Sequence, residues 1–353
     1  MDHLHYLINS LDKEKMLEAI ESFPRQIKEA YDIARVVTLK LEGKNIQQVV
    51  ILGMGGSAIG GEVTVGLSQK FSKIPMFINR DYDVPRWVNA STLVVAVSYS
   101  GGTEETLSAL DVAIKQGAQL LIVSSGGQIS DIAKKQKADL ITIPDGLQPR
   151  AAFGFLFLAQ ITALWKLGLI DIPLDIWMED AVKEATFRTH QYSPDEIGGH
   201  AYSIARDLHE KIVAVFSGPG FLAPIAARWK GQICENAKTL AYHYQYPEMN
   251  HNEIVGWKQN PELLKNIAVV HLVDEDEDHY RVIARMDKTG QMLAHYAGGV
   301  YFFHTQGENL LSKIFSLVQL GDYVSYYLAL LNNENPTPVE AIGVLKAHLA
   351  TIR

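Results

Sequence analysis

Residues 93–106, LVVAVSYSGGTEET, decide the fold of this chain. Five apolar, mostly β-branched residues run into serines, glycines and a threonine, after which Glu104 and Glu105 open a helical pattern. This order is typical of a buried strand, a tight turn and the first turn of a helix. Backbone N–H groups are free at a helix start, where the helix dipole is positive, so the stretch predicts a cradle for a phosphate.

Length and composition indicate a globular protein with two domains of ordinary size. The chain has 353 residues, of which 47% are hydrophobic and 20% are charged. That content is sufficient for a large core. The formal net charge is −8 and no run of Lys or Arg stands out, which argues against nucleic acid or an anionic membrane as a partner.

The sequence carries no pattern of a secreted or membrane protein. No segment reaches the roughly 18 uninterrupted apolar residues of a membrane span, and the first residues lack the basic and apolar regions of a signal peptide. We therefore expect a cytoplasmic protein. The single cysteine, Cys234, excludes an internal disulfide and a cysteine-based zinc cluster.

Apolar strands alternate with helical patterns through most of the chain. Strands are expected at 49–52, 76–78, 93–97, 120–123 and 140–143, and again at 212–216, 267–273 and 300–303. Alternation at this spacing predicts an α/β fold of doubly wound parallel sheets. Ligands of such sheets bind beyond the carboxyl ends of the strands, where the glycine turns gather.

The order of elements divides the chain into four parts. Residues 1–40 read as surface helices, 41–190 as a first α/β domain, 200–335 as a second α/β domain, and 336–353 as a closing helix. The second domain repeats the strand–turn–helix order of the first at 212–224, with SGPG as its turn. The repetition is one of element order, because residue identity between the halves is weak.

The first glycine turn leaves the ligand open. Gly53, Gly55 and Ala58 satisfy G-x-G-x-x-G/A after a strand, and Asp81 follows one βαβ unit later, as in a dinucleotide site. A dinucleotide needs one pyrophosphate cradle, whereas this chain offers two small hydroxyl-rich turns, at Ser57 and at 98–106. The turn therefore has three interpretations. It binds a monophosphate, it binds a dinucleotide, or its glycines serve only to form a tight turn.

Several separated motifs resemble one known family. The first domain, with GMGGSAIGG at 53–61, SYSGGTEET at 98–106 and PRAAFG at 149–154, resembles the sugar isomerase (SIS) domains. With CENAK at 234–238, NHNEIVGW at 250–257 and NPTPVEAIGVLK at 335–346, the whole chain resembles the bifunctional phosphoglucose/phosphomannose isomerases, which have two SIS domains. The resemblance implies flavodoxin-like sheets, no cofactor or metal, a cytoplasmic homodimer, and reversible conversion of glucose 6-phosphate and mannose 6-phosphate to fructose 6-phosphate through a cis-enediol.

The resemblance also implies roles for particular residues. Glu235 matches the family's proton-transfer base, and Arg150 matches the arginine that holds the enediolate. His251, contributed by the other subunit, and Lys346 match the residues that open the sugar ring. Thr337 is the nearest candidate for the threonine that permits mannose use. The expected substrate-binding residues lie in the glycine turns: Gly56, Ser57, Ser98, Ser100, Thr103 and Thr106.

Two other classes of function remain as alternatives. A non-catalytic SIS protein that senses a phosphosugar would bind the ligand without turnover, and an NAD-dependent oxidoreductase would bind a nicotinamide cofactor with Asp81 on the ribose. No Walker A motif, no H-E-x-x-H zinc motif and no G-x-S-x-G hydrolase turn is present. The motifs therefore favour a self-contained isomerase acting on a hexose 6-phosphate.

Overall fold

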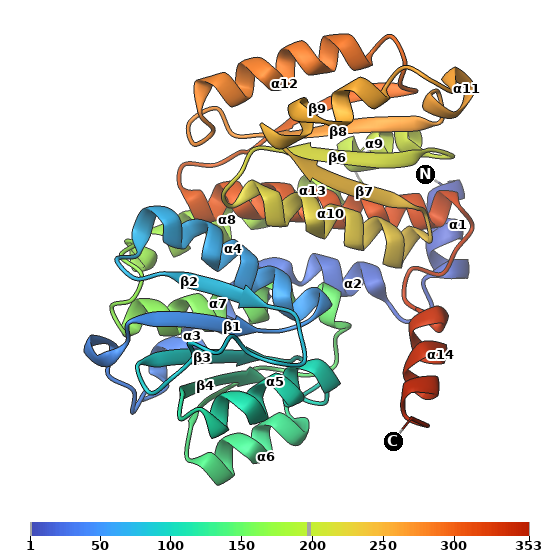
Figure 1. The fold of residues 1–353 in the computed structure, drawn as a ribbon. Helices are drawn as coiled ribbons and strands as arrows, with labels where there is room; N and C mark the ends of the chain where they lie inside the picture. Colours follow the sequence, from blue (N-terminus) through green and yellow to red (C-terminus); the bar gives the residue numbers. More distant parts are fainter. Residues whose placement is uncertain (1, 196–198, 353) are drawn as a thin grey trace.

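A computed structural model describes residues 2–195 and 199–352, and it contains two parallel sheets (Figure 1). The first sheet has the strand order β2-β1-β3-β4-β5 and the second has the order β7-β6-β8-β9. Both orders place the first strand of each domain beside the third, as in flavodoxin-like sheets, so the predicted fold class is confirmed. The strands are β1 (Gln48–Leu52), β2 (Met76–Asn79), β3 (Thr92–Val97), β4 (Gln119–Ser124), β5 (Asp139–Thr142), β6 (Ile212–Ser217), β7 (Ala241–Gln245), β8 (Ile267–Val273) and β9 (Gly299–His304).

Helices cover both faces of each sheet because the strands are apolar on both sides. The outer face of the first sheet packs on α5 (Glu104–Lys115) and α6 (Gly127–Gln136), and that of the second on α11 (Pro261–Leu264) and α12 (Tyr280–Leu293). The inner faces share one central core with four long helices between the sheets (Figure 1). These helices are α4 (Gly55–Phe71), α7 (Phe153–Lys166), α10 (Leu222–Ala237) and α13 (Leu310–Leu331).

The remaining helices complete the fold around this core. They are α1 (Asp2–Leu11), α2 (Met16–Glu21), α3 (Phe23–Val36), α8 (Leu174–Tyr192), α9 (His200–Leu208) and α14 (Glu340–Leu349), with the short 3₁₀ turns η1 (Gly43–Asn45), η2 (Pro149–Ala151), η3 (Glu248–His251) and η4 (Glu253–Gly256). Of the helices expected before residue 40, α3 contributes one apolar face to the central core. Its apolar stripe, which includes Ile27 and Ala30, is fully buried against α7.

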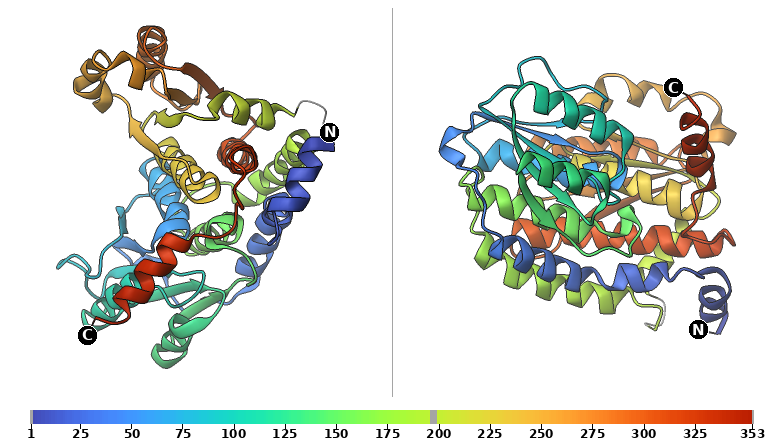
Figure 2. Two further views of the ribbon diagram at one scale, coloured as in Figure 1. Left: turned by 90° about the vertical axis from the view of Figure 1, so that its right-hand side faces the viewer. Right: turned by 90° about the horizontal axis from the view of Figure 1, so that it is seen from below.

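Helix α13 is long and apolar enough to cross a membrane by length and composition alone. However, 94% of its most apolar 18-residue window is buried inside the protein. Figure 2 shows α13 passing through the middle of the molecule, between the helices of both domains. Its composition is therefore explained by its position as a core helix.

Helix α14 is arranged differently from every other helix. The structure describes all of its residues, and none of them is buried. Figure 1 shows it at the end of a connection that follows α13, set apart from the helices of the first sheet. Three apolar side chains on it, Val344, Leu345 and Ile342, are at least 41% exposed. In a single chain this helix therefore has little tertiary support.

Candidate functional site

Three loops meet at the carboxyl edge of the first sheet, beside the point where the strand order reverses between β1 and β3. The Ser57 hydroxyl, at the start of α4, accepts a hydrogen bond from the Tyr99 amide at 3.2 Å. Within the loop after β3, the hydroxyls of Ser98 and Thr103 are 3.0 Å apart. The amide of Ile129 donates to the Gly101 carbonyl at 2.9 Å. The predicted cradle is thus a connected loop cluster built from three strand ends.

The predicted phosphate-binding residues differ in what they offer a ligand. Ser100 is exposed and Thr103 and Gly56 are half-buried, whereas Ser57, Ser98 and Thr106 are buried. The hydroxyl of Thr106 has no hydrogen-bond partner among the residues that the structure describes, and solvent does not reach it. A hydroxyl that faces an open cradle would be in contact with solvent. Ser100 and Thr103 are therefore the better placed groups, and a direct part for Thr106 stays a prediction.

Gly101→Ala is expected to disrupt this loop and to raise KM for a sugar phosphate. Gly101 has φ +69°, and an added Cβ would lie 1.8 Å from the Gly126 carbonyl oxygen, so backbone would have to move. We expect a loss of roughly 1–3 kcal/mol in the free energy of unfolding, as for other overpacked sites. Gly102→Ala is the matched control, because the space around that Cβ is open and the residue lacks a left-handed φ. Equal kinetics and urea midpoints for the two variants would contradict this account.

Arg150 connects the first domain to the second. It lies in η2, whose Pro149 carbonyl oxygen would be 2.8 Å from a Cβ added to Gly56, so η2 sits directly against the first glycine turn. Its guanidinium is 4% exposed and donates to Asn236 Oδ1 at 2.7 Å and to Glu235 Oε2 at 3.4 Å. Burial lowers the pKa of Arg150, and the charge of Glu235 acts in the opposite direction.

The same guanidinium holds the segment that leads to α14. Arg150 Nη2 donates to the carbonyl oxygens of Pro336 at 2.8 Å and Thr337 at 2.7 Å. A guanidinium has five N–H groups. One Nη1–H is therefore left without a partner among residues 2–195 and 199–352, next to the group that contacts Glu235.

The buried ion pair between Arg228 and Asp322 supports the backbone of Arg150. Arg228 on α10 donates to the Arg150 carbonyl at 2.9 Å and pairs with Asp322 of α13 at 2.7 Å. Gln232 donates to the same carboxylate at 2.6 Å. Burial raises the pKa of Asp322, and Arg228 opposes that change. These contacts fix α10 and α13 at the place where Arg150 enters the second domain.

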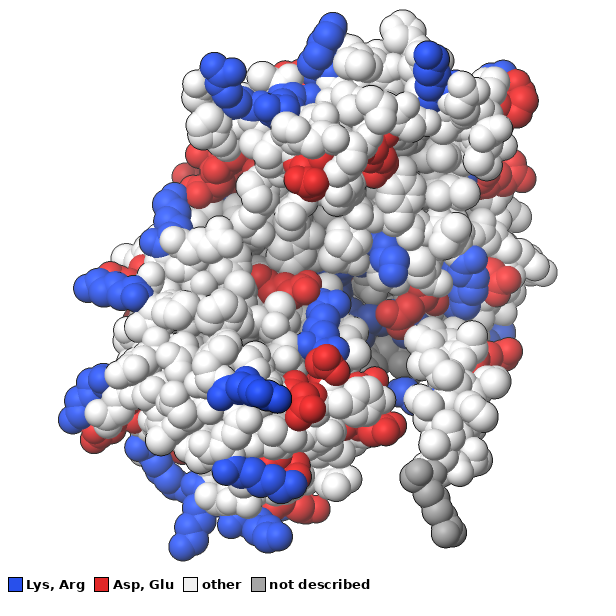
Figure 3. All heavy atoms as spheres, viewed as in Figure 1, with Lys and Arg blue, Asp and Glu red and all other residues white. Residues whose placement is uncertain are grey.

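Glu235 lies in the last turn of α10, at the border of a pocket. Its side chain is 32% exposed. The pocket has a volume of about 520 Å³ and is also lined by Cys234, Lys238 and residues of the segment 334–342. Figure 3 shows the surface hollowed between α14 and the helices of the first sheet. A solute can therefore reach the Glu235 carboxylate, which a proton-transfer base requires.

Thr337 is close to this group but its side chain faces inward. Its carbonyl accepts from Arg150, whereas its hydroxyl is buried and has no hydrogen-bond partner within the described part of the chain. The residue is 7% exposed. Its predicted part in the use of mannose stays a prediction.

Within residues 2–195 and 199–352, neither His251 nor Lys346 makes a hydrogen bond or an ion pair with Glu235. Helix α10 runs antiparallel to β7, so Glu235 lies near the beginning of β7, whereas the exposed His251 follows its end in η3. The strand alone spans roughly 13 Å. Lys346 is exposed on α14. The expected contribution of His251 from a second subunit stays a prediction.

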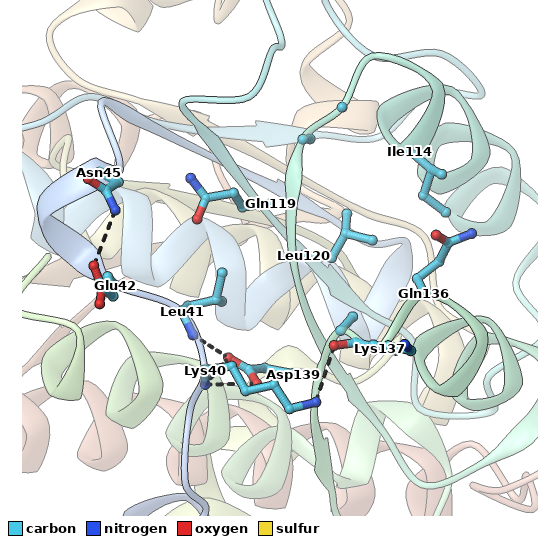
Figure 4. A pocket seen from close by; sticks show the side chains of 13 residues that line it. Lys40, Leu41, Glu42, Asn45, Ile114, Gln119, Leu120, Gln136, Lys137 and Asp139 are labelled. Atoms are coloured by element: carbon cyan, nitrogen blue, oxygen red, sulfur yellow. Dashed lines mark hydrogen bonds between the residues drawn. The ribbon is translucent and has the colours of Figure 1, made fainter.

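A second pocket lies at the opposite edge of the first sheet and has a structural explanation. It has a volume of about 490 Å³ and opens where β4 and β5 begin. One of its two carboxylates, that of Asp139, accepts hydrogen bonds from the backbone amides of Lys40 and Leu41 (Figure 4). Asp139 thereby fixes the segment between α3 and β1. Within the described residues, no three His, Cys, Asp or Glu side chains are grouped so that they could hold a metal ion.

The sequence reasoning missed the supporting residues of the site. Asn236 orients Arg150 and donates to the Ser325 hydroxyl at 3.0 Å, and Lys238 bonds three backbone carbonyls. Both belong to CENAK, which was assigned only one functional residue. Their position beside the candidate base Glu235, within the same motif, was the sequence signal that could have identified Asn236 and Lys238 as supporting residues. Arg228 and Asp322 carried no such signal, because only folding brings them together.

Comparisons with known proteins identify the family and agree with the fold. Residues 198–349 match the bacterial phospho-glucose isomerase C-terminal SIS domain. The bifunctional phosphoglucose/phosphomannose isomerase of Caldicellulosiruptor bescii is 41% identical over 96% of this chain and 100% of its own. The enzyme of the same name from Aquifex aeolicus is 35% identical over 95% of this chain and 98% of its own.

Solved structures share the fold at much lower identity. A hypothetical protein of Thermus thermophilus superimposes with a TM-score of 0.74 and 15% identity, over 99% of this chain and 94% of the other. At that identity the likeness concerns the fold alone. The relatives from C. bescii and A. aeolicus match nearly end to end, and on that ground the chain belongs to the bifunctional phosphoglucose/phosphomannose isomerase family.

Proposed function

We propose that this protein is an isomerase that interconverts glucose 6-phosphate or mannose 6-phosphate with fructose 6-phosphate through a cis-enediol intermediate. The observation that carries the proposal is the contact between Arg150 and Glu235, which joins the hydroxyl-rich loops of the first sheet to a solvent-accessible carboxylate of the second domain. It occurs in a chain whose relatives are named phosphoglucose/phosphomannose isomerases.

The loops of the first sheet would bind the phosphate. The hydroxyls of Ser100 and Thr103 and the amides at the start of α5 supply hydrogen-bond donors without a lysine. The positive end of the α5 dipole adds to their attraction for a dianion. Ser57 and Gly56, at the neighbouring turn, would contact the phosphate or the sugar.

Glu235 would carry out the proton transfer. Its carboxylate removes the proton from C2 of the open-chain aldose, and the electron pair of that bond forms the C1=C2 double bond of the enediolate. The same carboxyl group then returns a proton to C1. The C2 hydroxyl loses its proton and becomes the ketone while the oxygen on C1 gains a proton and becomes a hydroxyl, so no oxidant or reductant is consumed. The remaining Nη1–H of Arg150 would stabilise the oxygen that bears negative charge.

Ring opening would need a second chain. Proton transfer to O5 requires an acid, for which His251 and Lys346 are the proposed groups. Because His251 lies beyond the far end of β7 from Glu235, we propose a homodimer in which each site takes His251 from the partner subunit. For mannose 6-phosphate, rotation about the C2–C3 bond would bring the other C2 hydrogen to Glu235, with Thr337 as the proposed neighbour.

We also infer the organisation and location of the protein. The proposed parts are helices over 1–40, a first SIS domain over 41–190, a second over 200–335, and a C-terminal helix over 336–353 that returns to the active site. A water-soluble hexose phosphate as substrate and a net charge of −8 fit a cytoplasmic enzyme.

A subunit-mixing assay tests this proposal. Wild type should form fructose 6-phosphate from both aldose phosphates, whereas Glu235→Gln and His251→Ala should each be nearly inactive. Co-expression of the two variants should restore about a quarter of wild-type activity, because half of the randomly formed dimers carry one intact site. The coupled assay reports fructose 6-phosphate directly.

The outcomes separate the alternatives. Wild type that binds glucose 6-phosphate without turnover would indicate a phosphosugar sensor, and binding of a nicotinamide cofactor would indicate an oxidoreductase. Mixed dimers no more active than their parents would contradict the shared site while leaving the isomerase assignment in place.

A further inference from the structure

Lys238 ties two parts of the candidate site together, although it follows Glu235 by only three residues. Its ammonium donates to the carbonyls of Glu235 at 3.0 Å and Asn236 at 3.1 Å, which belong to the last turn of α10. It donates its third hydrogen bond to the carbonyl of Asn335 at 2.6 Å, across 97 residues of sequence. An ammonium has three donors, so every one of them is used.

Asn335 opens the segment from which α14 extends. Its side chain accepts from the Thr337 amide at 3.0 Å and donates to Glu14 at 2.8 Å. The next two carbonyls, of Pro336 and Thr337, accept from Arg150. Lys238 and Arg150 thus donate hydrogen bonds to three successive carbonyls, those of residues 335–337. Because α14 buries none of its residues, the hydrogen bonds to residues 335–337 and the burial of Pro336 and Thr337 constrain where it begins.

A helix-capping role alone does not explain this lysine. Lys238 ends α10 with φ 54° and ψ 28°, a left-handed conformation that glycine adopts without the steric cost that a Cβ causes. Lys137 ends α6 in the same conformation, with φ 55° and ψ 29°. The ammonium of Lys137 makes no hydrogen bond to a described residue, whereas that of Lys238 spans two segments. Lys137 and Lys238 thus share the left-handed helix end, but only the Lys238 ammonium joins two segments. Comparing the two lysines distinguishes the effect of the backbone conformation from that of the side chain.

We propose that Lys238 is a positioning residue, which holds the last turn of α10 and residues 335–337 in one fixed arrangement. Through the first it sets the direction of the Glu235 carboxylate, and through the second it sets the origin of α14, which carries Lys346. The inference rests on the proposed function for these two residues. The hydrogen bonds of Lys238 to both segments are a property of the fold, and hydrogen exchange can test them without measuring activity.

Lys238→Gly tests the proposal, because glycine keeps the left-handed C-cap and removes only the side chain. We expect an unchanged or raised Tm, faster hydrogen exchange at the amides of Glu334 and Thr337, and a kcat reduced roughly 10- to 100-fold with little change in KM. Lys238 makes no hydrogen bond to the loop 98–106, which the structure describes in full and which is proposed to bind the phosphate, so KM should stay unchanged. Lys238→Arg should restore most of the exchange protection and of kcat.

Lys137→Gly is the matched control and should leave both exchange over 332–338 and kcat as in wild type. Wild-type exchange and kcat in Lys238→Gly would overturn the proposal. A lower Tm with an equal loss of protection throughout the protein would also overturn it, because the lysine would then be only structural. If wild type formed no fructose 6-phosphate, the proposed function would fail, while the exchange measurement would still decide whether Lys238 holds the two segments together.

Discussion

Glu235→Gln is expected to lower kcat for both aldose phosphates by roughly 10²- to 10⁴-fold, the usual contribution of a general base. Glutamine has the size of glutamate and can still accept a hydrogen bond from Arg150, so packing and substrate binding should persist. It cannot take the proton from C2. Steady-state kinetics with a coupled assay, together with exchange of the C2 hydrogen with deuterated solvent, would measure the loss.

Glu340→Gln is the control for that experiment. Glu340 lines the same pocket of about 520 Å³ but lies at the exposed start of α14. Removal of its charge should leave kcat within a factor of about two, since exposed charges interact weakly through water. Wild-type solvent exchange and turnover in Glu235→Gln would assign the base to another residue.

Arg150→Met is expected to lower the free energy of unfolding by about 3–5 kcal/mol and to abolish activity, because a buried charged group and its contacts are lost. The side chain is 4% exposed, and its loss leaves the carbonyls of Pro336 and Thr337 and the amide oxygen of Asn236 without their donor. Each buried acceptor left unpaired costs about 1–3 kcal/mol. Urea denaturation at one fixed protein concentration would measure the effect.

Two further variants show whether the charge of Arg150 or the geometry of its guanidinium stabilises the protein. Arg150→Lys keeps the charge but loses the planar fork, so most of the loss in stability should remain. Arg35→Met should change stability by less than about 0.5 kcal/mol, because Arg35 is 58% exposed and stands 3.8 Å from Asp175. Full stability in Arg150→Lys would mean that charge alone, and not the geometry of the guanidinium, holds residues 335–337.

The strands of both sheets could be predicted where they were continuously apolar. β8 was predicted with its observed bounds, and β3 within one residue. The edge strand β7, AYHYQ, was missed because its alternating burial makes it too polar for a criterion based on apolar runs.

The loops of the candidate site could be predicted because their residues are consecutive. The contact between Arg150 and Glu235 could not, because 85 residues separate them and only the packing of α10 against the first domain brings them within 3.4 Å. The resemblance named both residues but not their partners. Asn236, Lys238 and Arg228 act through hydrogen bonds to distant carbonyls and carboxylates, for which spacing gives no signal.

The core shared by the two sheets limits how this protein can move. Since α4, α7, α10 and α13 bury their apolar faces in one continuous cluster, any rotation of one sheet against the other would open tightly packed contacts. The shared core therefore opposes the hinge bending by which many two-lobed enzymes enclose a substrate. We therefore expect a sugar to enter and leave through movement of peripheral elements. Helix α14, which buries none of its residues, would lose the least packing when it moves.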